Sequence, residues 1–89
     1  MSREVFKIQG TPNLEAKYKG MGYAIGAAVN GQLIDFVYLR DTFDIDDLET
    51  EAQVQALLRR PEIGPVVRHM QALGEVYVGM CSCYEFVVL

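Results

Sequence analysis

The sequence has few of the side chains from which metal centres and nucleophilic catalytic sites are built. Its 89 residues include one histidine, His69, and two cysteines, Cys81 and Cys83. A single C-x-C pair with one histidine is a poor match to zinc-ligand spacing, and only the fold could bring Cys83 and His69 together as nucleophile and base. We interpret the thiols as small buried side chains and His69 as a solvated helix residue. We therefore expect no metal ion, no cofactor and no enzymatic activity, and a small thiol enzyme that uses Cys83 is a minor alternative.

The chain also lacks the marks of an exported or membrane-bound protein. Two cysteines two apart on one strand lie about 6–7 Å apart, beyond comfortable disulfide geometry, which favours reduced thiols inside a cell. The first four residues, MSRE, contain no apolar segment typical of a signal peptide, and no apolar stretch approaches the length of a membrane span. We expect an intracellular protein that does not bind a membrane.

A glycine-rich nucleotide loop is absent as well. Gly20, Gly22 and Gly26 resemble the dinucleotide fingerprint, but their spacing is off by one and a strand is expected where that fingerprint needs a helix. The glycines are interpreted as small residues in a tightly packed strand.

Basic residues are missing from the most acidic part of the chain. The net charge is −4, which argues against simple phosphate binding. Residues 41–51 contain six acids, namely Asp41, Asp44, Asp46, Asp47, Glu49 and Glu51, and no lysine or arginine. One interpretation is helix capping on a solvated face. The other is an acidic patch that approaches a basic surface, such as one built to hold nucleic acid.

What the sequence does contain is an apolar content typical of one small domain, which we expect to span residues 1–89. Half of the residues are apolar. Residues 5–9 alternate as a strand does, with Val5 or Phe6 and Ile8 facing inward. Residues 10–13 have turn chemistry, and residues 14–19 are ambiguous between an exposed strand edge and a loop. Asn30-Gly31 predicts a type I′ hairpin between strands 23–29 and 32–39, with Asp35 facing water or a hydrogen-bonded partner.

Two helices are expected in the second half of the chain, after a connection over residues 40–46. The first covers about residues 46–60, begins with capping-box spacing at Asp46 and Glu49, and ends before Pro61. Its buried side is predicted to be Leu48, Ala52, Val54, Leu57 and Leu58. The second covers about residues 65–73, with Val66, Val67, Met70 and Leu73 as its apolar stripe and Gly74 just beyond its end.

The last stretch, residues 76–89, reads as two strands rich in β-branched and aromatic residues, with a bend over residues 79–83. The order is therefore β-β-β-α-α-β-β. We predict an α+β fold in which a curled, antiparallel, five-stranded sheet packs against two helices.

The same stretch carries a resemblance to a known family. The residues Val78-Gly79-Met80, Ser82-Cys83, Glu85-Phe86-Val87 and Leu89, with Tyr84 at an aromatic position, resemble the C-terminal motif of the broad-spectrum type II-C anti-CRISPR family. Residues 38–41, YLRD, and residues 6–8, FKI, are further matches, whereas residues 11–35 and 49–75 match only in pattern. The chain departs from the family at Tyr84, where a larger indole is expected, and at Cys81, where a smaller residue is expected.

The resemblance implies a phage-derived or mobile-element inhibitor that acts in the cytoplasm of a bacterial host. Members of the family bind the HNH nuclease domain of the type II CRISPR effector and cover its active site, so that target DNA is still bound but not cut. Carried across, the contacts with the catalytic histidine and the metal-binding aspartate fall on Ser82 and Cys83. Met80, Cys81 and Tyr84 are expected to line the contact or support the bend, and Asp41 to contact the partner or cap a helix. We expect a monomer that evades host defence by protein–protein interaction and does not contact nucleic acid directly.

Overall fold

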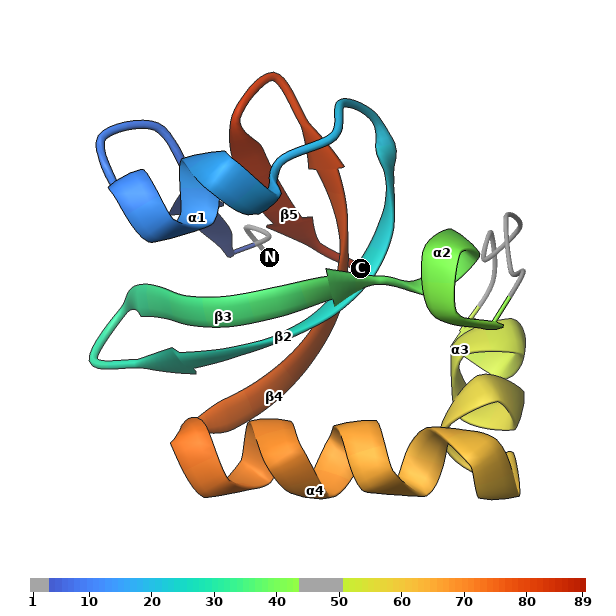
Figure 1. The fold of residues 1–89 in the computed structure, drawn as a ribbon. Coiled ribbons are helices and arrows are strands. Elements are labelled where there is room, and N and C mark those ends of the chain that lie inside the picture. The colour runs from blue at the N-terminus through green and yellow to red at the C-terminus, as the bar shows by residue number, and fades with distance from the viewer. Residues whose placement is uncertain (1–3, 44–50) are drawn as a thin grey trace.

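A curled antiparallel sheet of five strands forms the centre of the molecule (Figure 1). The structure is a computed structural model and describes residues 4–43 and 51–89. The strands are β1 (Val5–Lys7), β2 (Gly22–Val29), β3 (Gln32–Tyr38), β4 (Glu75–Ser82) and β5 (Glu85–Val88). Their order across the sheet is β1-β5-β4-β2-β3, and the sheet curls so that its two edge strands, β1 and β3, approach each other. The predicted α+β class, the five strands and the antiparallel curled sheet are confirmed.

The helices are α1 (Pro12–Lys17), α2 (Leu39–Phe43), α3 (Glu51–Leu58) and α4 (Gly64–Leu73), with the 3₁₀ helix η1 (Pro61–Ile63) before α4. The two predicted helices correspond to α3 and α4. The turn expected over residues 10–13 and the connection expected over residues 40–46 were wrong in part, because Pro12 opens α1 and Leu39 opens α2. The predicted start of the first long helix, including Asp46, Leu48 and Glu49, lies outside the described residues.

Two apolar clusters lie on the two faces of the sheet. On one face, Leu14 of α1 packs with Phe6, Ile8, Phe36 and Phe86. On the other face, Leu39, Leu57 and Ile63 from the helical segments pack with Ile25 of β2 and Val78 of β4. Strand side chains alternate between the faces, so neighbouring residues of β4 belong to different clusters.

The inward residues were predicted with a few errors. Phe6 and Ile8 are buried, whereas Val5 is 46% exposed. Ala52 is exposed rather than buried, and Leu73 lies at the exposed margin of the α4 stripe, whose Met70 is fully buried. The Asn30-Gly31 hairpin is confirmed, with φ values of 53° and 78° that suit a type I′ turn.

The Phe86 ring packs closely over the backbone of Gly79 in the two C-terminal strands. A Cβ atom at Gly79 would lie 2.5 Å from Cε1 of Phe86 and 2.6 Å from the carbonyl oxygen of Val87. The Phe86 ring therefore crosses β4 where no side chain opposes it, and it reaches Phe6 and Phe36 at centroid distances of 6.2 and 6.5 Å. Gly79 serves this close approach within β4, rather than the bend predicted over residues 79–83.

Replacing Gly79 with alanine is expected to lower the free energy of unfolding by roughly 1–3 kcal/mol, because the Phe86 ring has to move within a packed core. Chemical denaturation monitored by circular dichroism measures the change. Gly64→Ala is the matched control: its new methyl group would meet only the Nη1 end of the flexible Arg68 side chain, at 3.2 Å. Equal stability of the two variants would contradict the assigned contact.

Candidate partner-binding site

The β4–β5 hairpin carries Ser82 and Cys83, the two residues to which the resemblance assigns the contacts with the partner's active site. β4 continues through Ser82, β5 begins at Glu85, and the two-residue turn between them is Cys83-Tyr84. Both turn residues have positive φ, 53° for Cys83 and 59° for Tyr84, the geometry of a type I′ turn. The turn therefore lies at the far end of the stretch in which the bend was predicted.

We call the end of this hairpin, residues 82–84, the tip. Ser82 and Cys83 lie side by side in it. Ser82 is half-buried and Cys83 is exposed, and the Ser82 hydroxyl donates to the Cys83 sulfur at 3.7 Å. A hydroxyl that donates and accepts and a small, weakly polar thiol are thus presented together at the end of a strand pair. The structure brings these two predicted residues into one surface.

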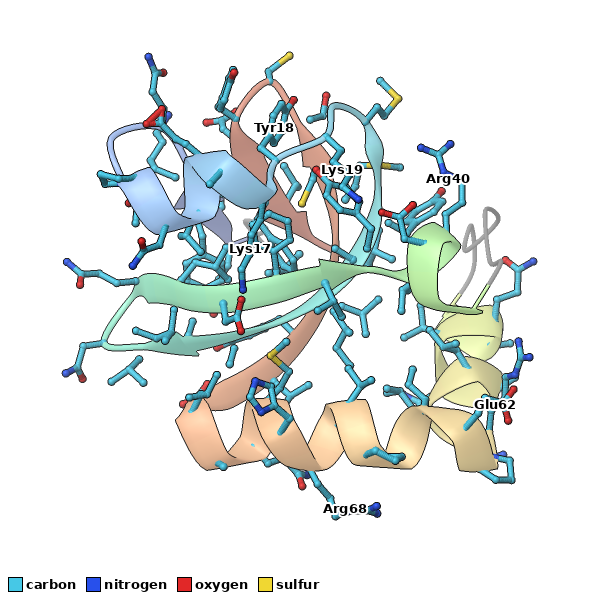
Figure 2. All side chains as sticks on the ribbon, viewed as in Figure 1. Lys17, Tyr18, Lys19, Arg40, Glu62 and Arg68 are labelled. Atoms are coloured by element: carbon cyan, nitrogen blue, oxygen red, sulfur yellow. The ribbon has the colours of Figure 1, made fainter. Side chains whose placement is uncertain are left out.

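Tyr84 fastens the tip to the first segment of the chain. Its carbonyl oxygen accepts hydrogen bonds from the backbone N–H of Ile8, at 2.9 Å, and of Gln9, at 3.4 Å. Its ring stacks on Tyr18 with a centroid distance of 4.2 Å and an interplanar angle of 22°. Figure 2 shows Tyr18 pointing from the end of α1 toward the hairpin. A left-handed conformation is unfavourable for tyrosine, and these contacts hold the residue in it.

Tyr18 was not predicted as part of the site, since the Tyr18–Tyr84 stack joins residues far apart in the chain. The local signal was an aromatic residue between Lys17 and Lys19, in a segment read as an edge or a loop. Lys19 and Gly20 are themselves positioned by Tyr38: its hydroxyl accepts from the Lys19 N–H at 2.9 Å and donates to the Gly20 carbonyl at 3.1 Å. The α1–β2 connection is thereby held beside the tip.

Cys81 has a supporting position rather than a contact position. It is fully buried in the cluster under α1, where burial raises the pKa of its thiol to about 11, with a hydrogen bond to Tyr38 acting in the opposite direction. Burial likewise raises the pKa of the neighbouring Tyr38 hydroxyl to about 12. Both groups stay neutral across the physiological range. Cys81 was expected either to line the contact with the partner or to support the bend, and its burial fits the second role.

Met80 and Asp41 occupy different surroundings. Met80 is half-buried on the face of β4 opposite Cys81. Asp41 lies in α2 and its carboxylate pairs with the Lys19 ammonium at 2.8 Å, so its charge is partly neutralised within the protein. Residues 44–50 of the acidic run lie outside the described residues.

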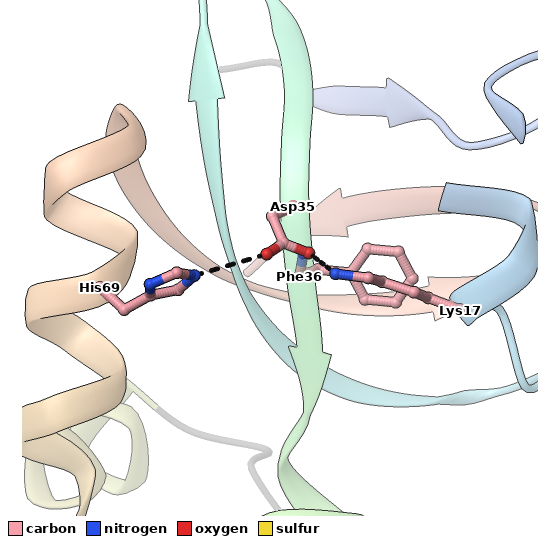
Figure 3. Close-up of polar contacts among 4 residues, drawn as sticks. All are labelled: Lys17, Asp35, Phe36 and His69. Atoms are coloured by element: carbon pink, nitrogen blue, oxygen red, sulfur yellow. Dashed lines mark hydrogen bonds and ion pairs between the residues drawn. The ribbon is translucent and has the colours of Figure 1, made fainter. Parts of the chain in front are cut away.

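His69 lies beside Asp35 (Figure 3). Its Nε2 is 3.6 Å from Asp35 Oδ2, while Asp35 Oδ1 accepts from the Lys17 ammonium and from the Phe36 N–H. Asp35 thus has the partners predicted for it. Asp35 is level with Ala27, which pairs with Val76, six residues before Ser82 on β4 and so about 20 Å away along the strand. Neither a Cys83–His69 pair nor a C-x-C-His metal site is assembled, and the described residues hold no group of three metal-ligating side chains.

Comparison with known proteins leaves the site to be argued from its own geometry. No protein-family model matches the chain, and no curated protein matches its sequence. None of the described helices has the length and apolar character needed to cross a membrane.

Thiol labelling distinguishes the two cysteines. With an alkylating reagent near pH 8, the native protein is expected to take up one label per chain, at Cys83, since Cys81 is buried and its pKa is raised to about 11. Mass spectrometry after digestion locates the label, and Cys83→Ser removes it. Two labels in the native state would contradict the burial of Cys81. A Cys83 that reacts far faster than a free thiol would revive the thiol-enzyme alternative.

The Tyr18–Tyr84 stack is expected to contribute about 0.5–1.5 kcal/mol to stability beyond simple area burial. A double-mutant cycle of Tyr18→Ala and Tyr84→Ala, measured by denaturant unfolding, isolates this coupling from the separate effects of each substitution. Tyr18→Phe keeps a ring in place and should retain most of it. A coupling energy near zero would show that the rings lie together without bracing the tip.

Proposed function

We propose that this protein inhibits a type II-C RNA-guided CRISPR nuclease by binding its HNH domain and covering the active site. The observation that carries the proposal is the position of Ser82 and Cys83 together at a braced hairpin tip. The same two residues lie in the stretch that resembles the anti-CRISPR motif. The protein acts as a binding partner and needs no chemistry of its own.

The chemistry of the tip suits an enzyme active site as its target. The Ser82 hydroxyl can donate to or accept from an imidazole, and it can donate to a carboxylate, the two groups expected at a histidine- and metal-dependent nuclease centre. The Cys83 thiol is small and has a low desolvation cost in a narrow pocket. A target that must keep these groups to cut DNA cannot change them to escape, so a tip that binds them is expected to inhibit related nucleases as well.

The contacts that hold the tip in place reduce the conformational entropy that the protein loses when it binds a partner. A loop that is already fixed in its bound shape loses less conformational freedom on association. Tyr84 is held by two backbone hydrogen bonds and by the Tyr18 ring, so Ser82 and Cys83 are presented on a rigid support. An inhibitor of this kind gains affinity from preorganisation as well as from contacts.

A second candidate function is mimicry of nucleic acid by the acidic run over residues 41–51. It would use charge rather than the hairpin tip, and it predicts steep dependence on salt and competition with DNA. In the described part of the run, the Asp41 carboxylate is paired with Lys19, which lowers the net charge available there. Inhibition through the tip is the favoured function because Ser82 and Cys83 lie together in the stretch that carries the resemblance.

The test compares DNA cleavage with target-DNA binding by a type II-C effector in the presence of the protein. Cleavage should be lost and binding retained. Loss of both would favour mimicry of nucleic acid by the acidic run, and no effect on either would contradict inhibition.

In the same assays, Ser82→Ala combined with Cys83→Ala should weaken binding to the isolated HNH domain by about 30-fold or more, corresponding to about 2 kcal/mol for a central hot spot. The unfolding midpoint should stay close to that of the wild type, because Cys83 is exposed and Ser82 is only half-buried. Gln32→Ala, an exposed position beside the opposite hairpin, is the control and should bind normally. Full inhibition by the double variant would show that the tip is not the contact.

A further inference from the structure

Directly below Ser82, one face of the sheet carries a row of apolar side chains. Strand register places four residues level with one another: Val5 pairs with Val87, Val87 with Met80, and Met80 with Tyr23. Paired residues of neighbouring strands point to the same face, so these four side chains form one row across β1, β5, β4 and β2. We name it the outer row, and it consists of Val5, Val87, Met80 and Tyr23.

The outer row begins at the helix-covered cluster, against which Tyr23 packs, and extends from there across β4 and β5 to the edge strand β1. Phe6 and Phe86 point to the α1 face, so Val5 and Val87 point to the opposite face, which carries α2, α3 and α4. The main helix contacts on the opposite face are with β2, β3 and β4. Val5 is 46% exposed, and Leu89, next to Val87 on this face, is 45% exposed. Apolar surface thus continues past the helices to the edge of the sheet.

This surface is continuous with the hairpin tip. Ser82 follows Met80 by two residues on β4, so both side chains point the same way and lie about 6–7 Å apart. Ser82 pairs with Glu85, and Glu85 pairs with Lys7, whose ammonium lies 2.7 Å from the Glu85 carboxylate. A charged pair therefore borders the outer row, in the arrangement of an apolar centre with a polar rim that is common in protein interfaces.

A stable interface has to be larger than the area that Ser82 and Cys83 provide. A specific protein–protein complex buries about 800 Å² on each partner, far more than Ser82 and Cys83 alone expose. Any partner that seats its active site on Ser82 has to cover the next residues of the same strand face. Met80 and Val87 are those residues.

We infer that the outer row is the second half of the partner-binding surface and docks an apolar patch beside the active site of the same nuclease domain. The inference rests on the proposed function, since it takes the partner that binds Ser82 and Cys83 as the occupant. It assigns Met80, Val87 and Val5 to direct contact, with Val5 at the margin.

The experiment measures binding of the isolated HNH domain by calorimetry for three double variants. Val5→Thr with Val87→Thr makes the outer row polar at nearly constant shape and with good strand propensity. Val29→Thr with Ile34→Thr is the matched control, since those two strand residues are 40% and 44% exposed around the opposite hairpin. Ser82→Ala with Cys83→Ala is the third variant. We expect about tenfold weaker binding for the outer-row variant and less than a twofold change for the control.

The outcomes separate the two ideas. Weak binding by the tip variant with unchanged binding by the outer-row variant overturns this inference and leaves the proposed function in place. Weak binding by the outer-row variant alone overturns the assignment of Ser82 and Cys83 while supporting the docking face. If the wild-type protein does not bind the domain, both fail.

A second measurement on the wild-type protein guards against a variant that does not fold. With ¹³C-labelled methionine methyl groups, addition of the HNH domain should shift or broaden the Met80 signal. Met70, a fully buried residue of α4, is the internal control and should not respond. An unchanged Met80 signal at saturating partner would overturn the inference.

Discussion

The packing of the Phe86 ring over the backbone of Gly79 is the contact on which the rest of the structure depends. β4 is the central strand of the sheet, and β5 joins it to the edge strand β1. The Phe86 ring crosses β4 at its residue without a side chain and reaches Phe6 on one side and Phe36 on the other. One side chain thus ties together strands from the beginning, the middle and the end of the chain. The hairpin that presents Ser82 and Cys83 is the extension of this strand pair beyond the core.

The tip combines local strain with long-range support. Two residues without glycine's freedom adopt positive φ, and both the backbone and the ring of Tyr84 are held by residues near the N-terminus. Cys81 and Tyr38 fill the core beneath, with raised pKa values that keep both groups neutral. Ser82 and Cys83 therefore lie over a packed layer that carries no charge.

How much of this could be predicted depends on whether the information is local. Asn30-Gly31 has the residues that favour a type I′ turn, and that hairpin was predicted correctly. Cys83-Tyr84 adopts the same geometry without those residues, so the bend was predicted over residues 79–83, mostly too early in the chain. The helices α1 and α2 were missed because helices of six and five residues are marginal on their own and are formed by tertiary packing of Leu14 and Leu39. Ser82 and Cys83 were placed at a strand junction from sequence. The Tyr18–Tyr84 stack follows only from the packing of the end of α1 on the hairpin, and the outer row only from strand register.

The two hairpins of the sheet imply an order of assembly. The β2–β3 hairpin needs only its own turn residues, and the loop closed between its strands is short, so it can form early. The Cys83-Tyr84 turn depends on Ile8, Gln9 and Tyr18, which lie some 65 to 75 positions earlier in the chain, so it can take its final shape only after β1 and α1 have docked. We therefore expect the tip to be completed late in folding. A partly folded chain would not display Ser82 and Cys83 in their final geometry, and the ordered tip is itself a sign that the N-terminal and C-terminal segments have met.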